Sequence, residues 1–197
     1  MRYDEDHKQK TRQKVLQAAA RTIRAEGPDR VGVAAIMAEA GLTHGGFYAH
    51  FSSKDELIAE AIRQMFEDAS ERRRGWIEGK PPAEGLRDYV KFYLSRSHRD
   101  GRGSGCPLTA LATDIPRLPE AAKIVFGEGV ARMTASMTAL LDGIGWTDAE
   151  AAAGALISEM VGAVSLSRSV ADPEQSERIL WTARRDILQR FGLEKTQ

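Results

Sequence analysis

The residues most suited to chemistry lie in one short stretch, Gly41-Leu42-Thr43-His44-Gly45-Gly46-Phe47-Tyr48-Ala49-His50-Phe51. Tyr48 and His50 carry a phenol and an imidazole, and Lys54 lies in the first turn of the helix expected to follow. Each side chain can donate to a phosphate oxygen, and the N-terminal amides of a helix favour the same anion. The chemistry predicted for this stretch is therefore binding to a nucleic-acid backbone.

The elements around this stretch are expected to be helices, because apolar residues recur at helical spacing and strand-like alternation is missing. Gly41 should close one short helix, and Thr43 should cap the next. Two short helices joined by three residues that include a glycine form a helix-turn-helix. Phe47 and Phe51 lie four residues apart and should anchor the second helix to the core. The helices expected here span about Gln9–Glu26, Val33–Ala40 and His44–His50.

Two capping boxes mark helix starts in the rest of the chain. Ser53 with Glu56 should open a long helix to about Trp76, and Thr147 with Glu150 should open another to about Val170. Other helices are expected over about Ala83–His98, from Cys106-Pro107 to before Pro116, over Leu118–Asp142, and from Asp172-Pro173 to Gly192. The sequence thus predicts an all-α fold of about nine helices. Residues 1–53 should form a helix-turn-helix head and residues 54–197 a larger helical body.

Composition limits the class of protein. The chain has 197 residues and no net charge, but residues 1–54 carry a balance of +3 and the remainder a balance of −3. A small basic head on an acidic body fits a protein that binds DNA. Cys106 is the only cysteine, which excludes an internal disulfide and a multi-cysteine zinc site. The acidic N-terminus is unlike a signal peptide, and no window has the run of apolar residues that a membrane span needs. We therefore expect a cytoplasmic protein that is not bound to a membrane.

An enzyme is not expected. The histidines are scattered without metal-ligand spacing, no nucleophile motif is present, and the glycines of 101–105 lack the dinucleotide-binding spacing. The chain is thus expected to need neither a metal nor another cofactor. A helical adaptor that binds protein instead of DNA is an open alternative. A steep loss of DNA affinity with salt would favour the DNA-binding interpretation, because counterions are released from phosphates.

The stretch from Gly41 to Leu57, together with the helices before it, resembles the TetR family of bacterial transcriptional regulators over roughly residues 10–60. The shared pattern is glycine, an apolar residue, Ser or Thr, three variable residues, aromatic residues ending in His-Phe, and then Ser-Lys-acid-acid-Leu. The resemblance implies that Tyr48, His50 and Lys54 contact the DNA backbone. It also implies that five residues approach base edges, namely Thr43, His44, Gly45, Gly46 and Ala49. Because two of these are glycines, DNA shape or close backbone approach should carry part of the specificity.

The resemblance also implies functions for the body. Its last two long helices, rich in small residues, would form a two-fold homodimer interface. Its middle helices would hold an inducer, with candidate contacts at Tyr89, Phe92, Tyr93, Cys106, Phe126, Met133, Met137 and Trp146. Cys106 precedes a helix whose amides should lower the pKa of its thiol, and some family members use such a cysteine to sense electrophiles or oxidants. The function expected is a repressor released from a palindromic double-stranded DNA operator by a small-molecule or electrophile signal.

Overall fold

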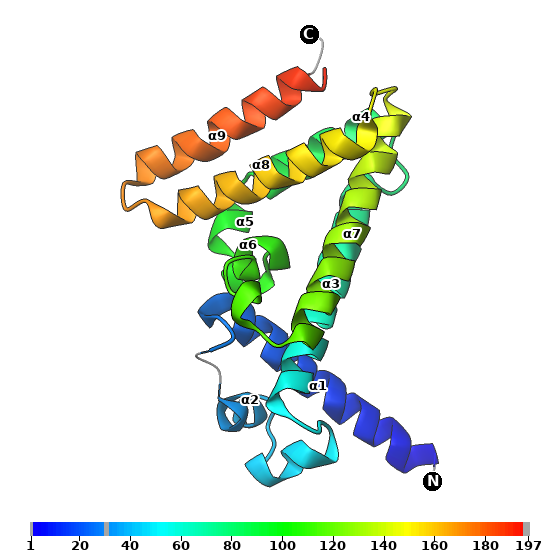
Figure 1. Cartoon of the computed structure of the whole chain (residues 1–197), viewed down its shortest axis with the longest axis vertical. Coiled ribbons are helices and arrows are strands. Elements are labelled where there is room, and N and C mark those ends of the chain that lie inside the picture. The colour runs from blue at the N-terminus through cyan, green and yellow to red at the C-terminus, as the bar shows by residue number, and fades with distance from the viewer. Residues whose placement is uncertain (1, 30–31, 195–197) are drawn as a thin grey trace.

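The chain folds into helices throughout residues 2–29 and 32–194, the part that this computed structural model describes. This part contains nine α-helices and three short 3-10 helices, and it has no strand, so the predicted all-α fold is confirmed (Figure 1). The elements are α1 (Arg2–Glu26), α2 (Val33–Glu39), η1 (His44–Ala49), α3 (Lys54–Ile77), α4 (Pro82–Tyr93), α5 (Arg96–Asp100), η2 (Arg102–Ser104), α6 (Pro107–Leu111), η3 (Ile115–Arg117), α7 (Glu120–Gly143), α8 (Ala149–Ser169) and α9 (Pro173–Arg190).

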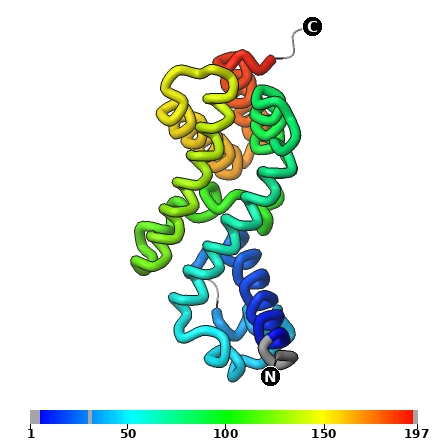
Figure 2. Tube along the Cα trace, turned by 90° about the vertical axis from the view of Figure 1, so that its right-hand side faces the viewer, coloured from blue at the N-terminus to red at the C-terminus, as the bar shows by residue number. Residues whose placement is uncertain are grey.

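The head consists of α1, α2 and η1, which lie at the end of the molecule opposite α9 (Figures 1 and 2). α1 starts earlier than the expected Gln9, at Arg2. Its buried face, which includes Leu16, Ala19 and Ile23, packs against the first turns of α3. The head therefore gains its core from α3, which is partly its own and partly the body's.

α3 joins the head to the body, running from η1 up along α7 (Figure 1). Its apolar stripe, Leu57, Ile58, Ala61, Ile62, Met65 and Phe66, is buried as the spacing predicted. Ser53 caps it, since the Ser53 hydroxyl oxygen accepts from the Glu56 amide at 3.0 Å. In a capping box the Glu side chain also accepts from the backbone amide of the N-cap residue, and here this second bond goes to the preceding residue. The Glu56 carboxylate accepts from the amide of Ser52 at 2.7 Å instead of the amide of Ser53.

The helix expected over Ala83–His98 is divided in two, so that prediction was wrong. α4 ends at Tyr93, and α5 begins at Arg96. Ser95 separates them because its hydroxyl donates to the Phe92 carbonyl at 2.6 Å and its oxygen accepts from the His98 amide at 3.2 Å. A serine that bonds to nearby backbone competes with helix continuation and favours a cap.

The body is completed by α7, α8 and α9, which pack in sequence, with α8 and α9 forming a hairpin (Figure 1). The predicted second capping box was wrong, because the N-cap residue of α8 is Asp148 in the left-handed region (φ 56°), and its side chain makes no cap bond. The start of α9 was predicted correctly. The Asp172 carboxylate accepts from the Glu174 amide at 3.0 Å, and Pro173 is the first helical residue.

The apolar composition of α8 has a consequence that the sequence analysis did not anticipate. Among the described helices it is the one long and apolar enough to cross a membrane by length and composition alone, with 21 residues and a mean hydropathy of 1.3. Core helices of soluble proteins pass the same test. α8 packs between α7 and α9, and these contacts bury 39% of its apolar window.

Candidate DNA interface and ligand cavity

A tight turn sets the angle between α2 and η1. Gly41 has φ +75°, a left-handed conformation that suits glycine, and the Leu42 amide donates back to the Met37 carbonyl at 2.8 Å. Thr43 occupies the N-cap position of η1, but its hydroxyl accepts no bond from the amides of that helix, so the predicted cap bond was wrong. The expected second α-helix is a 3-10 helix, His44–Ala49, which is the tighter form common in short segments.

Two phenylalanines hold η1 from the inside. Phe47 and Phe51 are both buried, and their rings stack with centroids 5.7 Å apart, as the four-residue spacing predicted. Tyr48 lies between them in sequence but points outward, with 73% of its surface exposed and its ring edge-on to Phe47 at 5.2 Å. A large exposed aromatic side chain held in place by a buried neighbour is available to a partner.

His50 lies at the end of η1 in contact with the cations of α1. Its carbonyl accepts from Arg12 Nε at 3.4 Å, and the Arg12 guanidinium lies 4.6 Å over the Phe51 ring. Burial and the nearby charges of Lys8 and Arg12 lower the pKa of His50, so the imidazole is neutral at neutral pH. Its buried Nδ1 has no hydrogen-bond partner among the described residues. His50 thus offers a neutral imidazole, and not a cation, to any ligand of this face.

Lys54 is exposed in the first turn of α3, beside the unpaired amides of that helix start. Three further exposed lysines lie along α1, at Lys8, Lys10 and Lys14. Arg12 and Lys8 were not predicted to belong to this site. Their four-residue spacing on one helix face was a usable signal, but the contacts of Arg12 with His50 and Phe51 were needed to show which face it was.

The base-reading positions predicted from the resemblance form an open surface. Thr43, His44, Gly45 and Ala49 are exposed, and Gly46 is half-buried. The structure brings these five residues together with Tyr48, His50 and Lys54 on the segment from η1 to the start of α3. One end of the molecule therefore carries all the predicted DNA-contacting positions (Figure 1).

Arg24 connects this head to the body. Its guanidinium is buried, donating to the Met65 carbonyl at 3.1 Å, to the Asp68 carboxylate at 2.8 Å and to the Gly103 carbonyl at 3.3 Å. α1 is thereby tied both to α3 and to η2. A displacement of η2, which contains Gly103, would thus be transmitted to α1 of the head through the Arg24 hydrogen bond.

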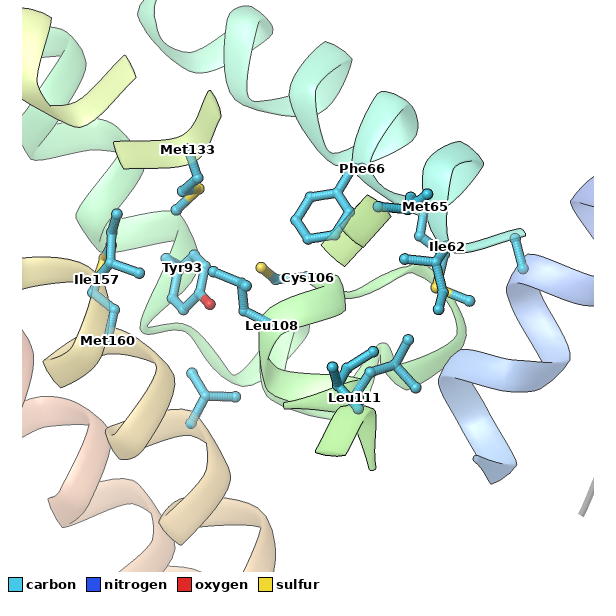
Figure 3. Packing of buried hydrophobic residues seen from close by; sticks show 14 of the residues in the cluster. Ile62, Met65, Phe66, Tyr93, Cys106, Leu108, Leu111, Met133, Ile157 and Met160 are labelled. Carbon is cyan, nitrogen blue, oxygen red and sulfur yellow. The ribbon is translucent and has the colours of Figure 1, made fainter. Parts of the chain in front are cut away.

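The expected ligand contacts lie in the middle of the body, although only some of them line one cavity. Tyr89, Phe92, Tyr93, Cys106 and Met133 surround a cavity of about 20 Å³ with Phe66, Ala69, Arg72, Arg73, His98 and Pro107. Figure 3 shows Phe66, Tyr93, Cys106 and Met133 in the buried core. That space holds about one water molecule. Phe126 packs edge-on against Phe66 with centroids 5.5 Å apart, Met137 is fully buried in the core, and Trp146 packs on Phe191. These last three residues do not line the cavity.

His98 was missed by the sequence analysis, and it organises one wall of this cavity. Its Nδ1 donates to the Tyr93 carbonyl at 2.7 Å, and its Nε2 accepts from the Cys106 amide at 3.1 Å. Burial lowers the pKa of His98 to about 4, and the charges of Arg168 and Arg72 act in the same direction. The ring is therefore neutral, and both of its nitrogen atoms are occupied in joining α4 to the start of α6.

Cys106 occupies the N-cap position of α6, as predicted, but the expected lowering of its thiol pKa was wrong. The residue is 7% exposed, and burial raises the pKa of its thiol, outweighing the helix amides and the charge of Arg73. The thiol is therefore neutral at neutral pH. Among the residues that the structure describes, no group of three His, Cys, Asp or Glu side chains could hold a metal ion.

A wide apolar groove of about 670 Å³ runs between α8 and α9. Gly162, Ala163, Leu166, Ile179 and Ala183 form its floor, and charged residues such as Glu159 and Arg178 form its edges. Leu166, on α8, is 60% exposed in this groove. Trp181, on α9 but outside the groove, is 50% exposed. An exposed apolar face with a polar rim is typical of a protein–protein interface.

Known proteins resemble both parts of this arrangement. Residues 15–61 match the family model described as bacterial regulatory proteins, tetR family. The HTH-type transcriptional regulator YvdT of Bacillus subtilis is 29% identical over 91 residues, which is 45% of this chain and 47% of that protein. The matched part spans about half the length of the curated relatives.

Solved structures extend the likeness to the whole chain. A TetR-family transcriptional regulator from Agrobacterium tumefaciens is 24% identical, with a TM-score of 0.79 over 93% of this chain and 98% of its own. A TetR transcriptional regulator from Chloroflexus aurantiacus is 26% identical, with a TM-score of 0.75 over 93% of this chain and 97% of its own. The similarity in fold therefore covers the head and the body alike.

Proposed function

We propose that this chain, which belongs to the TetR family of bacterial regulatory proteins, is a homodimeric repressor that a small molecule releases from a palindromic DNA operator. The observation that carries the proposal is the outward face of the helix-turn-helix. Buried Phe47 and Phe51 fix η1, while Tyr48, His44 and Lys54 are left exposed beside a helix N-terminus. Fixed, exposed donors at one end of a molecule suit a duplex surface.

Two kinds of contact follow for this face. Tyr48, His50 and Lys54 would hold the phosphate backbone, with the exposed Lys8 beside them. Arg12 is ion-paired to Glu56 and Glu60 of α3 and positions His50 through its carbonyl. The base edges would be approached by Thr43, His44, Gly45, Gly46 and Ala49. Since most of these side chains are short or absent, sequence-dependent DNA shape would contribute to specificity.

The groove on α8 and α9 supports the dimer. Its small and apolar residues let a second copy of the same helix pair approach closely, with two-fold symmetry making each patch the partner of itself. A dimer is also needed physically, because η1 alone covers few base pairs. Two heads on a palindromic site double the contacts at fixed half-site spacing.

A chain of contacts links the cavity of the body to the head, and we assign the release signal to it. α5 and η2 follow one another between α4 and α6. Arg168 of α8 donates to two carbonyls of α5, that of His98 at 3.1 Å and that of Arg99 at 2.9 Å. Arg24 of α1 donates to the Gly103 carbonyl of η2. A ligand that displaces α4 or α6 would move this α5–η2 segment, and α1 would follow.

An electrophile acting on Cys106 is the weaker form of the signal, because a buried, neutral thiol is a poor nucleophile. If an electrophile is nonetheless the signal, alkylation should weaken operator binding in the wild type and leave Cys106→Ser unaffected. An identical response of both proteins excludes this route.

Footprinting on DNA upstream of the gene, with and without candidate ligands, tests the proposal. We expect a symmetric protected region, and we expect affinity to fall steeply with salt as counterions are released from phosphates. A flat salt dependence, or no protected region, would favour the helical adaptor that binds protein. Protection that persists with every ligand would leave a DNA-binding protein without the proposed release.

A further inference from the structure

The cavity of the body contains a buried positive charge without a counter-ion. Arg73 is 8% exposed, and its guanidinium donates to neutral groups, the Ser136 hydroxyl at 3.0 Å, the Ser70 hydroxyl at 3.2 Å and the Met133 sulfur at 3.5 Å. Within residues 6–29 and 32–194, no Asp or Glu lies within ion-pair distance of it. Buried charges are usually paired, as Arg24 is with Asp68 at 2.8 Å.

Two phenols in the same cavity also lack a strong acceptor. The Tyr89 hydroxyl donates to the Met133 sulfur at 3.7 Å, the same thioether that Arg73 uses. The buried Tyr93 hydroxyl makes no regular hydrogen bond among the described residues, and the polar group beside it is the Cys106 thiol, itself a weak partner. A thioether is only a weak acceptor. Three donors therefore line one cavity, and none of them has a strong, charged acceptor there.

The other polar groups of the cavity do not supply the missing negative charge. The Cys106 thiol stays neutral because burial raises its pKa. Both ring nitrogen atoms of His98 are already bonded to backbone groups. Arg72, which is partly exposed and also lines the cavity, adds a second cation. The site has an excess of donors and positive charge, and its acceptor must come from outside.

The remaining walls of the cavity are apolar, and they favour a ligand with an apolar part beside its acceptor group. Phe66, Phe92 and Pro107 are apolar, and Met133 is a flexible side chain that can change its packing. The present cavity of about 20 Å³ is too small for an organic molecule, so binding must move some of these side chains. Among the lining residues, Ala69, Arg72 and Phe92 are only partly buried, so the cavity lies closest to solvent on their side.

We propose that this cavity binds an organic monocarboxylate, whose carboxylate accepts from Arg73, Tyr89 and Tyr93 and whose apolar part packs against Phe66 and Phe92. One carboxylate supplies a single negative charge and enough lone pairs for all three donors. This inference rests on the proposed ligand-responsive body, and it names the chemical class of the inducer.

Binding is measured on the full-length protein without DNA, by calorimetry and by the shift in melting temperature. The ligands are benzoate, phenylacetate and hexanoate, each compared with its neutral amide. We expect at least one carboxylate to bind about tenfold or more tightly than its amide, a difference that corresponds to about 1.4 kcal/mol. Equal binding of acids and amides, no binding of any acid at millimolar concentration, or equally tight binding of inorganic phosphate overturns the proposal.

Three variants locate the site. Arg73→Gln and Tyr93→Phe should each weaken carboxylate binding severalfold or more and leave amide binding unchanged. Arg74→Gln is the matched control, because Arg74 is the exposed neighbour of Arg73 on the same helix. If Arg73→Gln fails to fold, Tyr93→Phe removes only a hydroxyl that makes no regular hydrogen bond. Carboxylate affinity unchanged in Tyr93→Phe, and in Arg73→Gln where it folds, contradicts the assignment.

The two proposals can fail separately. A carboxylate preference in a protein with no operator overturns only the proposed repressor. Operator binding in a protein that has no carboxylate preference overturns only this inference.

Discussion

At the residue scale, the pair Gly45-Gly46 is not explained by the packing of the head. A Cβ at Gly45 would meet no atom within 4 Å, and one at Gly46 would meet Met37 Cε at an ordinary 3.7 Å. Gly45→Ala should therefore leave the free energy of unfolding unchanged or raise it by up to about 1 kcal/mol, which is measured as an equal or higher melting temperature. Its operator affinity should fall, because the methyl group would separate the backbone from DNA. Unchanged or tighter operator binding would show that no close backbone approach takes place there.

Lys54 and His44 should behave differently when each is replaced by alanine. Lys54→Ala should weaken binding to all DNA sequences alike and reduce the salt slope by about one unit, because one phosphate contact is lost. His44→Ala should change which bases the operator tolerates. Binding is measured on operator variants over a range of salt concentrations. The control is Lys91→Ala, an exposed lysine on α4, which should alter neither property. The same effect from both substitutions would contradict the division into backbone and base contacts.

His98 should make the protein less stable in mild acid. Its pKa is about 4 in the folded protein and about 6.5 when unfolded. Between pH 6.5 and pH 4 His98 is protonated in the unfolded chain but not in the folded protein. The contribution of His98 to the free energy of unfolding is therefore fully present above about pH 6.5 and is lost as the pH falls toward 4. The loss amounts to roughly 3 kcal/mol, from about 1.4 kcal/mol for each pKa unit. Denaturant unfolding at several pH values measures it.

His98→Gln should flatten this pH dependence, while His44→Gln, at an exposed position, should keep it. Carboxylates that titrate in the same range are common to all three proteins, so the comparison cancels them. A slope that is the same in wild type and His98→Gln would mean that His98 is already accessible to protons in the folded state.

At the scale of elements, one glycine sets the distance between α3 and α7. A Cβ at Gly129 would lie 2.4 Å from ring atoms of Phe66, which is itself buried against Phe126. Gly129→Ala must displace that ring and should cost about 1–3 kcal/mol. Gly127, two residues earlier on α7, is exposed and has nothing within 4 Å of its Cβ position. Gly127→Ala should gain up to about 1 kcal/mol. Equal melting temperatures for the two variants would contradict the close contact.

Local signals predicted many elements, and contacts distant in sequence decided the rest. Ser53 and Asp172 cap helices as predicted, because a cap needs only its neighbours along the chain. Thr43 and Thr147 have the right residue type but make no cap bond, because the turns before η1 and α8 have a different backbone path. No signal in the sequence marked Ser95 as a break rather than a helical residue.

The candidate site shows the same division between local and distant contacts. The predicted DNA-contacting positions all lie between Thr43 and Lys54, so one sequence motif identified them together. The cavity draws residues from α3, α4, α5, α6 and α7, with Cys106 at the N-cap of α6. Arg73 was missed because an arginine on a long helix is most often exposed, and only the packing of α7 against α3 buries it.

At the scale of the whole molecule, the dimer should decide whether the head can function. Leu166→Glu places a charge in the middle of the apolar groove between α8 and α9. It should convert a dimer to a monomer in sedimentation and reduce operator affinity by at least about tenfold, because each head then binds one half-site alone. Ile124→Glu is the matched control, since Ile124 is 55% exposed on α7, away from that groove. It should remain dimeric and bind normally. A dimeric Leu166→Glu protein would place the interface elsewhere, whereas a monomer with full operator affinity would show that the two heads bind DNA independently.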